Sequence, residues 1–459
     1  MDVEILARMQ FAFTIMFHYI YPPLSIGLGL LLVIIEGIYM KTGDQSYLRM
    51  ARFWTKMFAV TFAIGVATGI VMEFEFGTNW ASYSRYVGDV FGSALAAEGV
   101  FAFFLESGFL ALLLFGWERI SPRLHYFSTI MVCLGAHFSA IWIVVANSWM
   151  QTPAGFHIVG DGLSARAEII DFWAMVFNPS SVDRLLHTIV GAWLAGAFLV
   201  ISVSAYYLLK GRHKKFAVNS LRVALMVAGV SVALQAVIGD MSARGVAKNQ
   251  PMKLAAMEGI YQTQKGAPLV LFGVPDSEAK LVKKEVSIPK FLSFLSFHDF
   301  NAEIKGLNEV PRADWPNVKA VFTTYRMMLF MWGLMVVTVI LAWWKWRKGT
   351  LAESKGVLRL MAVSVIFPQV ANQAGWVAAE MGRYPWIVQD LLRISEGLSK
   401  SVSAEHVLGS LIMFTAVYLF LFFMFLYLFN EKIKHGPDEP EAETPYHSLH
   451  VLAERFDNE

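Results

Sequence analysis

The chain has 459 residues, of which 56% are hydrophobic and only 16% are charged. Soluble domains carry about 25% charged residues, so this composition excludes an ordinary soluble enzyme and is typical of a polytopic membrane protein. The net charge of +2 gives no sign of nucleic-acid binding. The single cysteine, Cys133, excludes both a disulfide within the chain and a CxxCH haem-attachment motif.

Nine apolar segments are each long enough to cross a bilayer, which takes about 20 residues. They lie at 10–38, 54–74, 94–116, 126–147, 186–209, 219–239, 321–344, 357–378 and 406–429. We therefore predict an all-α membrane protein with about nine transmembrane helices. The chain starts Met1-Asp2-Val3-Glu4, without a basic segment or a small-residue cleavage site, so we expect no removable signal peptide.

Lysine and arginine gather in alternate turns between these segments, and basic turns face the cytoplasm. The basic turns lie at 41–56, 119–123, 210–215, 345–355 and 432–434. This pattern places the N-terminus and the long polar stretch outside the membrane and the C-terminus in the cytoplasm. We expect four regions: six transmembrane helices in 1–239, one large extracytoplasmic loop in 240–320, three further helices in 321–430 and a cytoplasmic tail in 431–459.

An ionisable side chain inside a span is costly, and its presence there is a functional hypothesis. His18 lies in the outer third of the first segment. It can ligate a metal or form a hydrogen bond with a neighbouring helix, and we weigh these two readings equally. Pro22 and Pro23 follow it and are expected to bend the helix, as is tolerated beside protein or a cofactor.

The third segment carries two carboxylates, Glu98 and Glu106. On an ideal helix they would lie about 80° apart and about 12 Å apart along the axis. Such a ladder suits a proton relay or a ligand beside a metal. Ser139 in the fourth segment could continue the relay, although a lone serine more often bonds to its own helix. His137 is a rival ligand that we rank below His18 and His187.

A histidine and a methionine open two segments near the outer face, His187 in the fifth and Met328 in the seventh. Together they would make a six-coordinate, low-spin haem suited to electron transfer. Arg326 beside Met328 could pair with a haem propionate through its planar guanidinium. Glu380 and Arg383, after the eighth segment, form either an ion pair or a carboxylate on iron with an arginine on a propionate.

With these residues the chain resembles subunit I of the cytochrome bd-type quinol oxidases over nearly its whole length. The resemblance rests on motifs in matching order. They are Arg8-Met9-Gln10-Phe11-Ala12-Phe13 before His18, Gly77-Thr78-Asn79-Trp80 after Glu73, Glu98-Gly99, Phe103-Phe104-Leu105-Glu106-Ser107, Ala146-Asn147-Ser148-Trp149-Met150-Gln151, His187-Thr188, Lys253-Leu254-Ala255-Ala256-Met257-Glu258, Gly375-Trp376 and Gly382-Arg383-Tyr384-Pro385-Trp386.

The resemblance implies a terminal oxidase with three haems: a low-spin haem b, a high-spin haem b and a haem d or further haem b. His187 and Met328 would ligate the low-spin haem iron, and His18 and Glu380 would each ligate a high-spin haem iron. Glu98 would stand at the dioxygen-binding haem as a possible sixth ligand, in a proton path with Glu106 and Ser139. The resemblance further implies that Trp376 lies between haems.

The same resemblance implies quinol as substrate, with Lys253 and Glu258 in the quinol-binding part of the outer loop, and dioxygen as oxidant. It implies a second large membrane subunit and a small single-span subunit in a bacterial cytoplasmic membrane. Three features depart from the family pattern. The outer loop is short compared with that of the long-loop members of the family. His137 stands where an asparagine is expected, and Glu75 stands where a glutamine is expected.

Two other functions remain open on the sequence. One is an ion-coupled transporter, in which the carboxylates bind coupling ions and the central loop acts as a lid. The other is a haem-bearing electron-transfer subunit that never meets dioxygen. The first needs no iron, and the second needs iron but no vacant position on it.

Overall fold

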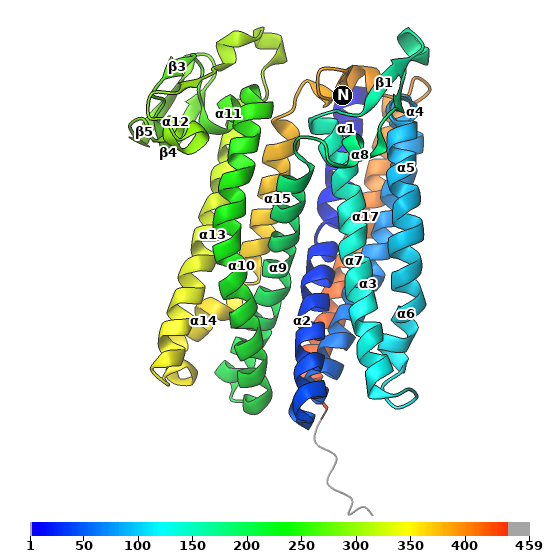
Figure 1. Cartoon of the computed structure of the whole chain (residues 1–459), viewed down its shortest axis with the longest axis vertical. Helices are drawn as coiled ribbons and strands as arrows, with labels where there is room; N and C mark the ends of the chain where they lie inside the picture. The colour runs from blue at the N-terminus through cyan, green and yellow to red at the C-terminus, as the bar shows by residue number, and fades with distance from the viewer. Residues whose placement is uncertain (1, 439–459) are drawn as a thin grey trace, which may run out of the picture.

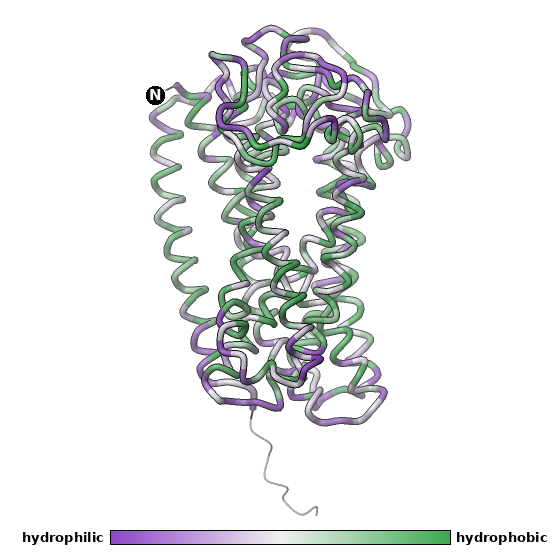
Figure 2. Tube along the Cα trace, turned by 90° about the vertical axis from the view of Figure 1, so that its left-hand side faces the viewer, coloured by the Kyte–Doolittle hydropathy of each residue, from purple (hydrophilic) through white to green (hydrophobic). Residues whose placement is uncertain are grey.

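The computed structural model describes residues 2–438 and shows a long helical bundle with a polar head at one end (Figure 1). Within that range, nine helical segments are long and apolar enough to cross a membrane, which confirms the predicted fold class. The bundle is apolar along its middle and polar at both ends (Figure 2). The expected tail 431–459 is described only as far as 438, and helix α17 continues to His435.

The long helices account for the spans. They are α1 (Val3–His18), α2 (Tyr21–Thr42), α3 (Gln45–Thr78), α5 (Gly88–Glu98), α6 (Phe104–Phe115), α7 (Pro122–Gln151), α9 (Ser181–Lys210), α10 (Lys214–Asn249), α13 (Val318–Arg347), α14 (Lys355–Val363), α15 (Ile366–Met381) and α17 (Ala404–His435). A π-helical turn, Gly99–Phe103, joins α5 to α6.

Shorter elements fill the connections. The short helices are α4 (Ala81–Tyr86), α8 (Phe172–Val176), α11 (Pro251–Glu258), α12 (Phe291–Phe297) and α16 (Ile394–Gly397), with 3-10 turns at Gly162–Ser164, Leu307–Glu309, Arg312–Asp314 and Leu351–Glu353. The strands form antiparallel pairs: β1 (Phe156–Val159) with β2 (Arg166–Ile169), β3 (Gln264–Lys265) with β6 (Glu303–Ile304), β4 (Leu269–Asp276) with β5 (Leu281–Ile288), and β7 (Trp386–Val388) with β8 (Leu392–Arg393).

Several spans depart from the expected bounds. The first is broken: α1 ends at His18 and α2 restarts at Tyr21, with Pro22 and Pro23 in its first turn. Proline lacks a backbone N–H and is tolerated where a helix begins, so these two residues end one helix and start the next. The sixth span continues to Asn249, ten residues beyond its apolar stretch, and the polar stretch therefore leaves the helix at Gln250.

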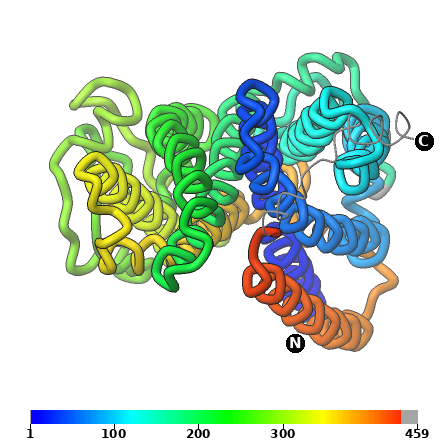
Figure 3. The backbone as a smooth tube through the Cα atoms, turned by 90° about the horizontal axis from the view of Figure 1, so that it is seen from below, coloured from blue at the N-terminus to red at the C-terminus, as the bar shows by residue number. Residues whose placement is uncertain are grey.

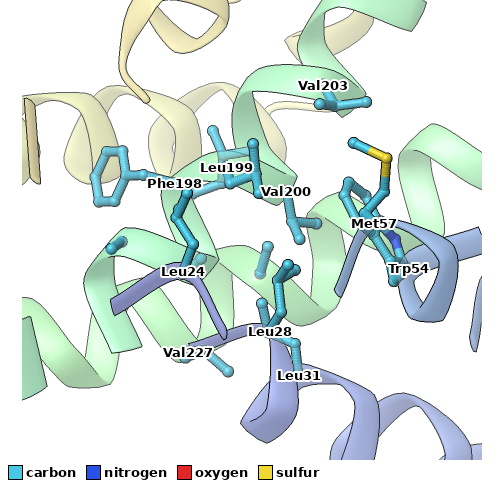
Figure 4. Packing of buried hydrophobic residues seen from close by; sticks show 14 of the residues in the cluster. Leu24, Leu28, Leu31, Trp54, Met57, Phe198, Leu199, Val200, Val203 and Val227 are labelled. Carbon is cyan, nitrogen blue, oxygen red and sulfur yellow. The ribbon is translucent and has the colours of Figure 1, made fainter. Parts of the chain in front are cut away.

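The helices form two groups that meet along α2, α7 and α9 (Figure 3). One group contains α9, α10, α13, α14 and α15, and the other contains α1, α2, α3, α5, α6, α7 and α17. We call the end that carries the head the loop end, and the N-terminus also lies there (Figure 1). The main core lies where α2, α3, α9 and α10 meet, around Leu28, Leu31, Trp54 and Phe198 (Figure 4).

Two glycines allow α2 and α9 to approach at backbone distance. A Cβ on Gly27 would lie 2.7 Å from Gly196 Cα, and a Cβ on Gly196 would lie 2.6 Å from Gly27 Cα. Small residues let membrane helices pack closely, and this crossing joins the two helix groups.

Gly196→Val should therefore push α9 away from α2 and destabilise the protein by about 1–3 kcal/mol, the usual cost of overpacking. Thermal unfolding of the purified complex measures this as a lower melting temperature. Gly409→Val on α17 is the control, because a Cβ there meets nothing within 4 Å. Equal melting temperatures for the two variants would contradict the packing argument.

Candidate functional site

Glu380 is the centre of a polar cluster at the loop end of the bundle. Arg383 Nη2 donates to Glu380 Oε2 at 2.6 Å. Asn147 Nδ2 and Gln151 Nε2 of α7 each donate to Glu380 Oε1 at 3.1 Å. Arg184 of α9 approaches the same carboxylate at 3.9 Å. Donors from two helices, α7 and α9, and from the segment after α15 thus converge on one carboxylate of α15, which keeps 34% of its side chain accessible.

The arginines of this cluster carry unsatisfied donors. Arg383 is 7% exposed, and its Nε and Nη1 have no hydrogen-bond partner in the described part of the chain. Arg184 Nε is likewise buried without a partner among residues 2–438. Buried guanidinium N–H donors without a partner are costly, so these donors indicate an anionic ligand that completes the site. Arg184 escaped the sequence analysis because nothing marks it beyond its place one turn before His187.

His18 is oriented by a hydroxyl of α3. Thr68 Oγ1 donates its proton to Ile64 O at 2.8 Å, so it can only accept from His18 Nδ1, 3.0 Å away. The imidazole proton therefore lies on Nδ1, and Nε2 keeps its lone pair. A histidine that donates through one nitrogen is oriented to bind a metal through the other.

His187 faces α10. Gln235 Nε2 lies 3.0 Å from His187 Nδ1, while the Gln235 amide oxygen is buried without a partner within 2–438. The Gln235 amide nitrogen also lies 3.3 Å from His187 Nε2 and donates to His187 O at 3.4 Å, so Gln235 contacts both ring nitrogens. Turning that amide over would let its oxygen accept from Nδ1–H, and a metal at Nε2 would require the Gln235 side chain to shift. Met328 on α13 faces α15, where a Cβ on Gly375 would lie 2.9 Å from the Met328 sulfur.

Helix α15 carries a stripe of polar and aromatic residues toward both helix groups. Gln369 and Asn372 have buried amide atoms that lack partners in the described chain. Gln373 Nε2 donates to Met16 O at 2.7 Å. Trp376 lies 5.5 Å from the Tyr19 ring and 5.7 Å from the Arg184 guanidinium. Trp376 therefore lies between Tyr19, which follows His18 directly, and Arg184, which lies one helical turn before His187.

The two carboxylates of the third span face one helix. Ser139 Oγ donates to Glu98 Oε1 at 2.5 Å, rather than to its own helix. A Cβ on Gly135, one turn earlier on α7, would lie 2.9 Å from Glu106 Cβ. The π-helical turn between the carboxylates inserts one residue. Their effective spacing becomes seven residues, which leaves them about 20° apart instead of about 80°.

His137 is occupied by protein groups. Its Nδ1 lies 2.7 Å from Cys133 O and must donate to it, and its Nε2 accepts from Trp193 Nε1 at 2.9 Å. Glu75, the other departure from the family pattern, accepts from Thr14 Oγ1 at 2.6 Å in a buried position. In this arrangement neither nitrogen of His137 is available to a metal.

The two residues expected at the quinol lie on different sides of α11. Lys253 is 2% exposed and donates to the amide oxygens of Gln151 and Gln250. Burial, and next the charge of Arg184, lower the pKa of the Lys253 amine well below its usual value. Glu258 is also 2% exposed, and burial raises its pKa although Arg326 opposes this.

Arg326 has partners other than a predicted propionate. Its Nη2 donates to Glu258 Oε2 at 2.6 Å, and its Nε donates to Val270 O at 2.9 Å. Its Nη1 reaches Met257 O at 3.3 Å. Arg326 thus joins α13 to α11 and β4. Within the Glu380 cluster the guanidinium groups with unpaired donors are those of Arg383 and Arg184, and outside it Arg52 and Arg244 each have a buried Nε without a partner in the described chain.

A buried pair of a histidine and a glutamate lies far from Glu380, near the turns opposite the loop end. His125 Nδ1 lies 2.6 Å from Glu36 Oε1, and Thr129 Oγ1 donates to Glu36 Oε2 at 2.5 Å. His125 Nε2 lies 3.1 Å from Leu113 O. The sequence analysis missed Glu36 because it sits in an unbroken apolar run.

The donor set fits haem better than a bare metal ion. Over the described residues, no group of three or more His, Cys, Asp or Glu could hold a metal ion. A haem iron needs only one or two protein ligands, and its propionates need cationic donors. His18 and His187, each with a second nitrogen engaged by Thr68 or Gln235, and the unpaired donors of Arg383 and Arg184 meet those needs.

Comparisons of the sequence and of the structure with known proteins all identify the same family. The sequence model of the family described as "Cytochrome bd terminal oxidase subunit I" matches residues 6–437. The chain is 37% identical to cytochrome bd ubiquinol oxidase subunit 1 of Bacillus subtilis, over 100% of this chain and 98% of the relative. It is 34% identical to cytochrome bd-II ubiquinol oxidase subunit 1 of Escherichia coli, over 97% and 99%. Among solved structures, bd oxidase from Geobacillus thermodenitrificans superposes with a TM-score of 0.87 at 29% identity, covering 95% of this chain and 99% of that one.

Gln151 holds Glu380 and Lys253 at once, so Gln151→Leu should leave two buried polar groups short of a partner. We expect a loss of about 1–3 kcal/mol of stability, the usual cost of such groups. The measurement is thermal unfolding of the purified complex. Gln45→Leu is the control, because Gln45 is exposed and makes only a weak contact with Gly43 O at 3.5 Å. A melting temperature equal to that of the control would show that Gln151 bridges nothing of consequence.

Proposed function

Because the chain belongs to the cytochrome bd terminal oxidase subunit I family, we propose that it oxidises quinol at its loop end and reduces dioxygen to water at haems held in the same half of the bundle. At the level of the family, it is a subunit of a quinol oxidase, an oxidoreductase, and a multi-pass protein of the bacterial inner membrane. The family implies haem cofactors, quinol as substrate and a partner subunit. We further propose a small single-span subunit.

We assign the haem ligands from the site geometry and the family resemblance. His187 and Met328 would hold the low-spin haem b, and His18 and Glu380 would each hold a high-spin haem, one of b type and one of d or b type. Arg383 and Arg184 would receive propionates, and Arg326 would serve the loop instead. When bound, the haems supply the electron transfer and the dioxygen chemistry.

Quinol would bind beside α11. Glu258 has a raised pKa, so it can take a quinol hydroxyl proton and hold it, within reach of Arg326. Lys253 donates to two amide oxygens and could donate to a quinol oxygen in place of one of them. Trp376 would occupy the space between the haem sites.

Release of protons on one face of the membrane and uptake on the other would separate charge without a proton pump. We propose that the loop end faces outside, so that quinol protons leave there. Protons for water would come from the opposite face through Glu106 and then Glu98 with Ser139. The support for this route is that both carboxylates face α7 along one line. Two quinols and one dioxygen give two quinones and two waters.

The observation that carries the proposal is the set of unpaired guanidinium donors on Arg383 and Arg184 around a partly accessible Glu380. A reduced-minus-oxidised spectrum of the purified complex tests it. Haem bands are expected, with a shift of the reduced spectrum when carbon monoxide is added. Absence of a Soret band in haem-replete cells would favour an ion-coupled transporter. Haem bands that carbon monoxide leaves unchanged would favour an electron-transfer subunit without dioxygen chemistry.

Met328→Leu should convert the low-spin haem to high spin, because leucine offers no lone pair for the sixth position. Absorption and magnetic circular dichroism spectra of the reduced complex measure this. Met327→Leu is the control, since Met327 is 40% exposed on the neighbouring position of α13. Survival of the low-spin signal in Met328→Leu would mean that the sixth ligand lies elsewhere.

Glu106→Leu should slow dioxygen reduction by about tenfold or more, since a positioned proton carrier is worth about 10²–10⁴-fold. The low-spin haem should remain reducible by quinol, because the proposed oxidation of quinol at the loop end does not use Glu106. Oxygen consumption and stopped-flow haem reduction separate the two effects. Glu118→Leu is the control, because the Glu118 side chain is 81% exposed in a turn. Unchanged turnover in Glu106→Leu would remove Glu106 from the relay.

A further inference from the structure

The β4–β5 hairpin presents an apolar surface although it belongs to the polar head. Its exposed large apolar side chains are Leu271, Phe272, Val274, Leu281, Val286 and Ile288. Phe272 is 67% exposed and pairs across the strands with Val286, which is 57% exposed. Exposed apolar side chains that pair across a hairpin in this way mark a contact surface for a partner or a membrane.

The hairpin hangs at the depth where α13 becomes apolar. Arg326 Nη2 and Nε donate to Val270 O at 2.6 and 2.9 Å, which fixes β4 beside the third turn of α13. That point lies eight residues after Val318, or about 12 Å below the start of the helix. Figure 1 shows β4 and β5 along the lower edge of the head, next to α13 and toward the helices.

The apolar surface continues from the hairpin onto α13. Directly after Arg326, the side chains of Met327, Leu329 and Phe330 are 40%, 43% and 56% exposed. Exposed apolar side chains on a membrane span contact lipid unless another subunit covers them. The hairpin also carries exposed charged side chains of both signs, which are Lys280, Lys283, Lys284, Glu278 and Glu285. Lysine beside apolar side chains suits the lipid headgroup region, where its stem lies among apolar groups and its amine reaches water.

We propose that the β4–β5 hairpin rests in the outer headgroup region of the lipid bilayer, with Phe272 and Val286 inserted among the lipids. We assign lipid rather than a protein subunit as the occupant, because the hairpin is fixed by Arg326 beside the exposed apolar side chains of the α13 span and carries lysines whose amines can reach the headgroups.

This placement has a consequence for the substrate that rests on the proposed function. Arg326 ties β4 and Glu258 of α11 to the same point on α13. A hairpin seated in lipid therefore holds α11 at the bilayer surface. A long-chain quinol then reaches α11 sideways from the lipid, without crossing water.

The depth of the hairpin can be measured independently of activity. Single cysteines replace Phe272, Lys265 or Phe330 in a Cys133→Ser background, and each is spin-labelled in the full complex in lipid nanodiscs, with the unsubstituted background subtracted. Lys265 on β3, in the upper part of the head, is the water-facing control, and Phe330 on α13 is the lipid-facing control (Figure 1). Power saturation compares collisions with dioxygen and with a water-soluble nickel chelate.

A Phe272→Cys label with the lipid-like profile of Phe330→Cys supports the proposal. A water-like profile as at Lys265→Cys overturns it, and so does a label shielded from both reagents, which would indicate a covering subunit. These results stand whether or not the protein oxidises quinol.

Kinetics test the consequence. Phe272→Asp with Val286→Asp should raise the KM for a long-chain quinol in proteoliposomes by at least about tenfold, since each of the two apolar side chains buried in lipid contributes about that factor or more to the seating of the hairpin. The KM for a water-soluble short-chain quinol, the kcat and the haem spectrum should not change. Lys265→Asp is the control. An equal rise in KM for both quinols would point to a distorted site and overturn the lateral route.

Discussion

One partly buried carboxylate organises the polar cluster at the loop end of this protein. Glu380 lies in a membrane helix end, where an unpaired charge would be prohibitively costly, so it draws donors from every neighbouring element. Asn147 and Gln151 come from α7, and Arg184 comes from α9. Arg383 lies three residues after Glu380, just beyond the end of α15. These donors exceed what one carboxylate needs, and the excess positive charge prepares the site for the anionic edge of a cofactor.

The same cluster couples the head to the bundle. Gln151 bonds to Glu380 with its amide nitrogen and to Lys253 of α11 with its amide oxygen. Arg326 makes a second link, from α13 to Glu258 and β4. The segment proposed to meet quinol is therefore held at two points, one next to an expected iron ligand and one at the membrane surface. This hydrogen-bond network fixes the position of α11 relative to the Glu380 cluster.

Much of this could be predicted from residue types. Nine apolar runs predicted the spans, and the motifs around His18, Glu98, His187 and Glu380 predicted the family, which the comparisons confirm. Where local backbone geometry intervened, the sequence was a poorer guide. The 80° estimate for Glu98 and Glu106 assumed a regular helix, and the π turn at Gly99–Phe103 removed most of that angle. Arg326 was expected to face a cofactor, but it turns toward the loop because Glu258 and a strand carbonyl lie there.

The sequence by itself determined the class of protein, because the cost of exposing polar backbone to lipid restricts long apolar runs to helices. It also marked the side chains that we expect to carry chemistry, because ionisable groups are rare in spans. Only the tertiary structure decided which of them meet. Arg184 and Glu380 are almost 200 positions apart in the chain, and Glu36 and His125 are 89 apart. Such pairings depend on how helices cross, and they follow from packing over the whole bundle rather than from any local pattern.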